Sequence, residues 1–185
     1  MNISEKELAE LRDYRNKPDE DDIRYKQIIK QKLIESNKLI YLLHDKKLEE
    51  TESEPSDYIG EIILPYYILP GTQTTVRNYL CFETSFDYVS RDNSIVKYQE
   101  IIFYVLCHQD DINVAEVSVP RHDLISAVLI DIFNGCNYFG TQMKLVSNKP
   151  TIVDNVYPSR TLIFENHTTN SITRNGKVFN LRSGT

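Results

Sequence analysis

The sequence predicts an α+β fold: an antiparallel sheet with one long helix packed on it, together with N-terminal helices, extended loops and a C-terminal hairpin arm. Two observations support this prediction. Residues 78–108 hold two strand-like runs joined by the turn sequence SRDNS, which indicates an antiparallel hairpin. Residues 119–135 read as one helix with a broad apolar stripe, which is typical of a helix that lies flat on a sheet.

The N-terminal segment, residues 1–45, is expected to be helical. Ser4 followed by Glu7 is a capping-box pattern and predicts a short helix over about 5–15. A second helix is expected over about 20–35, with one or two further turns after it. These helices are weakly amphipathic, so we expect them to need a partner surface for stability.

Residues 46–76 are expected to form a linker and an extended, proline-rich loop. The first part is charged and poorly patterned, which indicates a surface loop. The second part contains IILPYYILPGTQT, which is apolar, but Pro65 and Pro70 exclude a central strand or a helix there. This stretch is either an extended segment lying along another surface or an irregular edge strand of the same domain.

Residues 77–168 are expected to form the α+β core. Side chains alternate with a period of two from Asn78 onward, as in a half-buried strand. The run 98–108 is apolar on both faces in its later half, so we expect it in the centre of the sheet. The helix at 119–135 covers one face, and the other face is either free or covered by the N-terminal helices. Two later strands are expected at 143–147 and 160–166, with a long loop at 148–159 between them.

Residues 169–185 are expected to form a hairpin arm. The dipeptide Asn175-Gly176 lies between strand-like flanks and is a strong signal for a two-residue hairpin turn. The arm has no acidic residue, and its basic residues are Arg174, Lys177 and Arg182. Because an isolated two-stranded hairpin is only marginally stable in water, we expect this arm to reach another surface.

Length and charge narrow the class of protein. A chain of 185 residues can bury a sizeable core as one domain with arms, and its net charge of −6 argues against nucleic acid as the main partner. It has no apolar run of the roughly 18 to 20 residues that span a bilayer, and no apolar signal-peptide core, so neither membrane insertion nor export is expected. Cys81, Cys107 and Cys136 are widely spaced, and we expect them to be reduced thiols of an intracellular protein.

The chain carries no phosphate loop, nucleophile elbow or zinc-protease motif. Cys107 and His108 are adjacent in a predicted strand, so their side chains point to opposite faces and cannot act as a nucleophile–base pair. We therefore predict a protein that is not an enzyme, with no catalytic residue, no cofactor and no metal. The alternative from another class is a small intracellular enzyme whose site would be built from His108, Asp110, Asp111 and His122.

Twelve tyrosines and no tryptophan indicate protein–protein contacts, because tyrosine in loops offers a large contact area at low entropic cost. The alternative is that these tyrosines only cover loop edges. The candidate subunit and partner contacts are Tyr66, Tyr67, Ile68, Leu69, Tyr157, Arg174, Asn175, Lys177, Phe179 and Arg182.

Three stretches resemble a known family in pattern and element order: VRNYLCFETSFDYVSRDNSIVKYQEIIFYVLCHQDD, RHDLISAVLIDIFN and MKLVSNKPTIVDNVYPSRTLIFE. They look like the tail-completion proteins of tailed bacteriophages, also called tail terminators or head-to-tail joining proteins. The resemblance covers about residues 76–166, with a helix near 23–43 in the usual place. The chain departs from the family pattern in the helix before Pro18 and in the arm after about residue 168, which leaves its position in the neck open.

The resemblance implies a structural virion protein of the tail or neck, assembled in the host cytoplasm into a ring that is usually hexameric. Such a ring terminates the tail tube and binds a neck or head-closure protein, and DNA meets it only in transit. An acidic subunit suits this channel, because negative walls repel phosphate. The alternative within the class is a head-closure or stopper protein, which the helix at 121–134 disfavours because those proteins are mostly small β-barrels.

Overall fold

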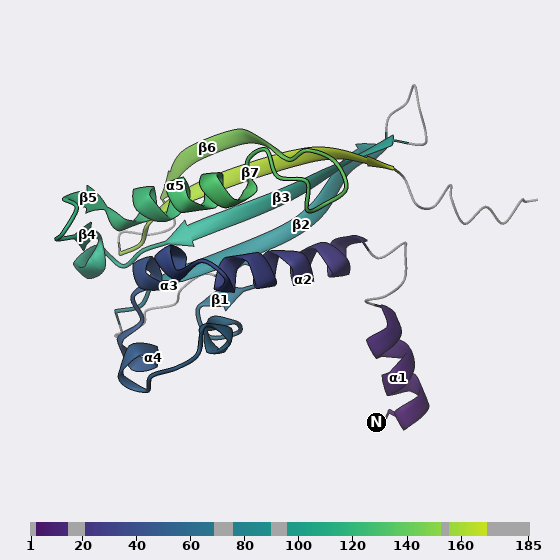
Figure 1. Cartoon of the computed structure of the whole chain (residues 1–185), viewed down its shortest axis with the longest axis horizontal. Helices are drawn as coiled ribbons and strands as arrows, with labels where there is room; N and C mark the ends of the chain where they lie inside the picture. Colours follow the sequence, from purple (N-terminus) through teal and green to yellow (C-terminus); the bar gives the residue numbers. More distant parts are fainter. Residues whose placement is uncertain (1–2, 15–20, 69–75, 90–95, 153–155, 170–185) are drawn as a thin grey trace, which may run out of the picture.

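The chain folds as one α+β layer structure, seen in a computed structural model that describes residues 3–14, 21–68, 76–89, 96–152 and 156–169 (Figure 1). Five strands form one sheet in the order β1-β2-β3-β7-β6, in which β1 runs parallel to β2 and the other neighbours are antiparallel. The strands are β1 (Ile63–Leu64), β2 (Tyr79–Val89), β3 (Val96–Leu106), β6 (Lys144–Ile152) and β7 (Pro158–Thr169). The predicted hairpin of β2 and β3 and the central place of β3 are confirmed.

Five α-helices lie among the described residues, with two 3-10 turns and a two-stranded ribbon. The helices are α1 (Glu5–Asp13), α2 (Asp21–Ile34), α3 (Asn37–Leu43), α4 (Lys46–Glu50) and α5 (Arg121–Phe133). The short elements are η2 (Pro55–Tyr58), η3 (Gln109–Asp111), β4 (Asn113–Val114) and β5 (Val119–Pro120). The predicted capping box is present, because Ser4 Oγ accepts from the Glu7 backbone N–H and Glu7 Oε2 accepts from the Ser4 backbone N–H.

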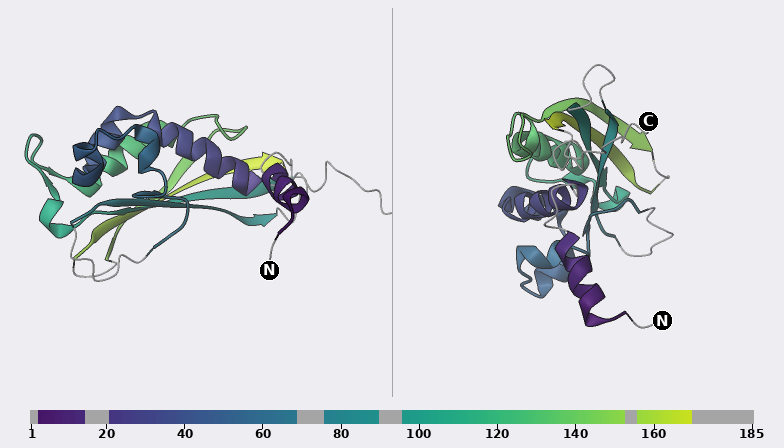
Figure 2. Two further views of the ribbon diagram at one scale, coloured as in Figure 1. Left: turned by 90° about the horizontal axis from the view of Figure 1, so that it is seen from below. Right: turned by 90° about the vertical axis from the view of Figure 1, so that its right-hand side faces the viewer.

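Helices α2, α3 and α5 lie side by side on one face of the sheet (Figure 2). The N-terminal helices therefore do not cover the second face, and that alternative is wrong. Burial along β3 alternates strictly over most of its length, because every second side chain points into the helical layer. Phe103 lies at the centre of this layer, with its ring centroid 5.0 Å from that of Phe133 and 5.8 Å from that of Phe164.

The broad apolar stripe of α5 serves two surfaces. Ile125, Leu129 and Phe133 are fully buried against the sheet, as expected for a helix lying flat on it. Leu124 and Val128 are only half-buried and face α3. The stripe is therefore wider than the sheet contact requires, and its surplus lines a groove described below.

The long loop predicted at 148–159 is wrong, because most of it belongs to β6 and β7. The prediction relied on Pro150 and Pro158. Pro150 lies in β6, which is an edge strand paired only with β7, and Pro158 is the first residue of β7. Neither position needs a backbone N–H for the sheet, so both prolines are tolerated.

The linker is more ordered than predicted, since α4 and η2 form where a surface loop was expected. Asp45 caps α4 by accepting from the Leu48 backbone N–H at 3.0 Å, and Leu48 and Tyr58 are buried. The following apolar stretch supplies β1, so the edge-strand alternative for this stretch is the observed one. The predicted turn at 90–94 lies outside the described residues, and so does the predicted hairpin arm except Thr169, which is the last residue of β7.

Candidate functional site

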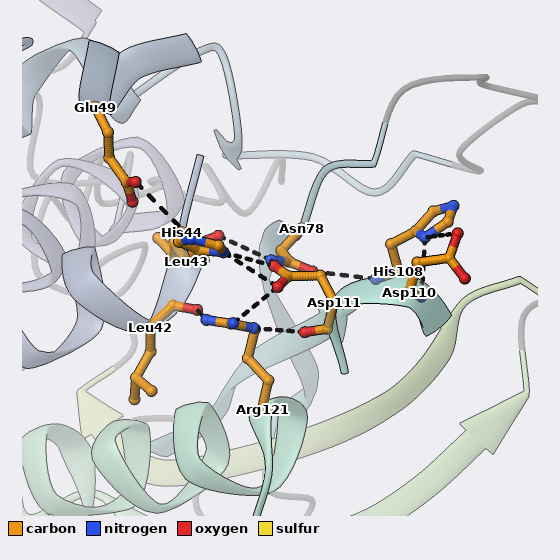
Figure 3. A network of polar contacts seen from close by, with 9 residues as sticks. All are labelled: Leu42, Leu43, His44, Glu49, Asn78, His108, Asp110, Asp111 and Arg121. Carbon is orange, nitrogen blue, oxygen red and sulfur yellow. Dashed lines mark hydrogen bonds and ion pairs between the residues drawn. The ribbon is translucent and has the colours of Figure 1, made fainter. Parts of the chain in front are cut away.

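A network of polar contacts surrounds Asp111, at the end of the sheet where α3 ends and α5 begins (Figure 3). Four elements contribute to it. His44 follows the last turn of α3 in the left-handed backbone conformation, with a φ of 48°. Asn78 precedes β2, Asp111 ends η3, and Arg121 is the first residue of α5. The cluster therefore joins segments that are far apart in the sequence.

Asp111 is held by three side chains. Arg121 Nη2 donates to Oδ1 at 2.9 Å, and Asn78 Nδ2 donates to Oδ2 at 2.7 Å. His44 Nδ1 lies 2.9 Å from Oδ2. Only 16% of the Asp111 side chain is exposed, so these contacts replace most of its hydration. The carboxylate is engaged on both oxygens and acts as a structural anchor.

The partners of Asp111 also bind backbone carbonyls. Arg121 Nε donates to the Asp111 carbonyl at 2.7 Å, and Arg121 Nη1 donates to the Leu42 carbonyl at 2.9 Å. Asn78 donates to the Leu43 carbonyl and accepts from the His108 backbone N–H. The C-terminal carbonyls of α3 and the connection from β3 to α5 are thus satisfied by two buried side chains.

Of the four residues considered for an enzyme site, His108 and Asp110 contact each other, whereas Asp111 pairs with Arg121. Asp110 lies 3.7 Å from His108 Nδ1, and its side chain is 67% exposed. His122 instead lies 3.5 Å from Asp123, which also pairs with Arg160. Burial lowers the pKa of His122, and Asp123 opposes that shift. Among the residues described by the structure, no group of three His, Cys, Asp or Glu side chains could hold a metal ion.

The three cysteine thiols lie in or beside the hydrophobic core. Cys81 and Cys107 are completely buried, and Cys136 is half-buried. Burial raises the pKa of Cys81 to about 11, and burial raises the pKa of Cys107 further. Both thiols are therefore protonated at neutral pH.

The predicted contact residues have different environments. Tyr66 and Tyr67 are 49% and 39% exposed, and Tyr67 packs on Tyr104 at a centroid distance of 4.6 Å. Ile68 is half-buried against the core. Tyr157 is wrong as a surface contact, because its side chain is 1% exposed and packs against the rings of Tyr79 and His108. The remaining candidates, Leu69, Arg174, Asn175, Lys177, Phe179 and Arg182, lie outside the described residues.

A mainly apolar groove, called here the α3–α5 groove, lies between α3 and α5. Its volume is about 610 Å³, and its lining residues are Asn37, Lys38, Tyr41, Leu42, Val117, Leu124, Ala127, Val128 and Asp131. Tyr41 and Val117 are 58% and 53% exposed. Sequence reasoning missed this surface, although the stripe on α5 was wider than one contact needs.

Comparison with known proteins gives one family. The model of the YomW family matches residues 36–166, well over half of the chain. The match runs from α3 into β7 and includes both the Asp111 cluster and the α3–α5 groove. Searches of curated proteins and of solved structures found no match. No helix in the described segments is long and apolar enough to cross a membrane.

Proposed function

Because this chain belongs to the YomW family, a family of phage-derived proteins, we propose that it is a structural protein of a tailed-phage virion. In this proposal, copies of the chain form a ring, expected to be hexameric, at the head–tail junction. The ring terminates the tail tube and joins it to the neck or head-closure protein. DNA passes through its channel.

The observation that supports this proposal is apolar surface that the chain's own core does not use. The α3–α5 groove is one such surface, and the exposed side of α1 is another. Tyr66 and Tyr67 add exposed aromatic area near the edge strand β1. Apolar surface of this kind marks protein–protein contacts, and its presence at several places suits a subunit that meets more than one neighbour.

The buried polar contacts around Asp111 are consistent with a structural subunit. The Asp111 cluster uses its charged groups to fix the junction of α3, β2 and α5, at the end of the molecule that holds the groove. A rigid junction presents the groove with a constant shape, which a ring of identical contacts requires. The net charge of −6 suits a channel wall that does not retain DNA.

The proposal is tested by removing the chain from the phage that encodes it. Electron microscopy of the lysate should then show filled heads separate from tails, and tail tubes of irregular length. Restoring the chain in trans should restore joined particles of uniform tail length. Joined, infectious particles made without the chain would refute the proposal. Empty heads beside tails of normal length would instead favour the head-closure alternative.

A further inference from the structure

Helix α1 has an apolar side that nothing in the described structure covers. Not one of its residues is buried, although its N-terminus is fixed by the complete capping box. Ile3, Leu8 and Leu11 are 49%, 37% and 55% exposed. Figure 1 shows the helix standing apart from the helical layer. A helix of nine residues is marginal in water by itself, so its stability depends on a surface that receives the apolar side.

The α3–α5 groove has the complementary property. Leu42, Leu124, Ala127 and Val128 line it together with the exposed side chains of Tyr41 and Val117. Both features carry exposed large hydrophobic residues: Ile3, Leu8 and Leu11 at the helix, and Tyr41 and Val117 at the groove. Grooves of this kind receive amphipathic helices through side chains spaced three or four residues apart, as Leu8 and Leu11 are.

Charges at the two surfaces also match. Lys38 and Asp131 line the groove. The helix carries an excess of acid, with Glu5, Glu7, Glu10 and Asp13 against Lys6 and Arg12. Lys38 can therefore receive an acidic residue of α1, and Arg12 can approach Asp131. These contacts would lie at the rim, where they orient the helix and add little affinity.

We propose that α1 of one copy docks its Leu8–Leu11 side into the α3–α5 groove of a second copy. This inference rests on the self-assembly in the proposed function, and it names the contact that links neighbouring subunits.

The length of the chain favours a second copy over the chain's own groove. Six residues separate Tyr14 from Asp21, so the intervening backbone spans at most about 25 Å when fully extended. The groove begins at Asn37, beyond the far end of α2, and the path from Asp21 to Asn37 along the helix is itself about 24 Å. Docking within one chain would require an almost straight linker along the whole of α2.

The contact is also directional. The donor helix and the acceptor groove are different surfaces, so each subunit gives one helix and receives one. Head-to-tail contacts of this type close into a ring when the rotation between neighbours divides a full turn. The inference therefore supplies a specific contact for the proposed ring.

Cysteine cross-linking of the full chain tests the contact. The two variants are Leu11→Cys in α1 and Ala127→Cys in the groove, each made in a Cys136→Ser background so that only buried native thiols remain. Mixing the two single variants under mild oxidation should give a disulfide-linked dimer. A matched control replaces Leu11→Cys with Val146→Cys, an exposed position on the edge strand β6 that should not cross-link to Ala127→Cys.

The double variant Leu11→Cys/Ala127→Cys separates the two possible occupants. Docking between copies predicts a ladder of linked chains that ends at the size of the closed ring. A single linked chain that migrates faster than the reduced chain, with no dimer from the mixed single variants, would show that α1 occupies its own groove and overturn the inference. No disulfide in either experiment would overturn it as well.

A second measurement does not depend on introduced thiols. Leu8→Asp/Leu11→Asp should weaken self-association at least about tenfold in sedimentation, because two apolar contacts at the centre of the interface are lost. The core should stay folded, since α1 contains no buried residue. Unchanged association would overturn the inference. Cross-linked rings that fail to cap tail tubes would leave this contact standing and refute only the function at the tail.

Discussion

The Asp111 cluster makes a strong prediction about stability, tested by Arg121→Met. Arg121 is 5% exposed and gives three hydrogen bonds, to the Leu42 carbonyl, the Asp111 carbonyl and Asp111 Oδ1. Methionine keeps much of the apolar volume and removes the charge and all three donors. Removing one partner of a buried ion pair costs about 3 to 5 kcal/mol, because the remaining charge is left poorly compensated.

Urea unfolding followed by circular dichroism measures this cost. With a slope of about 2 to 3 kcal/mol per molar urea, the midpoint should fall by about 1 to 2.5 M. Arg160→Met is the matched control, because Arg160 pairs with Asp123 through side chains that are 25% and 34% exposed. A pair that solvent partly reaches contributes less than a fully buried one, about 1 kcal/mol, so its midpoint should move much less.

A double-mutant cycle tests the cause. Asp111→Asn should cost less in the Arg121→Met background than in the wild type, with a coupling of about 1 to 3 kcal/mol. Equal midpoints for Arg121→Met and Arg160→Met, or strictly additive effects of the two substitutions at 111 and 121, would refute the reasoning.

Three further predictions concern protonation, thiol access and the C-terminal arm. Burial holds the pKa of His122 below its ordinary value in the folded chain, so the unfolded chain binds more protons as pH falls below about 6.5. Stability should therefore decline below that pH, and His122→Gln should flatten the decline in urea midpoints; parallel curves would contradict this. A thiol reagent at pH 8 should modify Cys136 first and Cys107 only on unfolding, and equal rates would show that the core opens readily. Deleting residues 170–185 should leave the far-ultraviolet spectrum of the core intact and impair assembly, and unimpaired assembly would remove the arm from the contact set.

Local sequence signals predicted the elements that depend on local chemistry. Ser4 and Glu7 fixed the start of α1, and Ser36 caps α3 by accepting from the Leu39 backbone N–H. Period-two alternation identified β2, and a run that is apolar on both faces in its later half identified β3. Their pairing follows from the short connection between them. These signals depend on residues close together in the sequence, so they can be recognised without knowledge of the rest of the fold.

The incorrect predictions concern residues whose surroundings are set by distant parts of the chain. Pro150 excludes a central strand, but β6 is an edge strand, and nothing local to Pro150 shows which strands lie at the edge. Tyr157 has the loop neighbours of a surface residue, yet its ring is enclosed by Tyr79 and His108 from other segments. Burial of this kind depends on segments that meet only in the folded chain.

The candidate site was also only partly visible in the sequence. Asp111 was named as a member of the alternative enzyme site, but its partners His44, Asn78 and Arg121 come from three separate elements, and none belongs to a spaced motif. The sequence contains one sign of the α3–α5 groove: the apolar stripe of the α5 helix extends to Leu124 and Val128, beyond what the sheet contact needs.

The mass of the full-length chain in solution, measured by native mass spectrometry with and without the tail tube protein of the same phage, tests the central claim most directly. The account predicts a single closed oligomer, expected to contain six copies, that forms alone or at tube ends and is lost in Leu8→Asp/Leu11→Asp. A chain that stays monomeric in both conditions and does not bind tubes would contradict it.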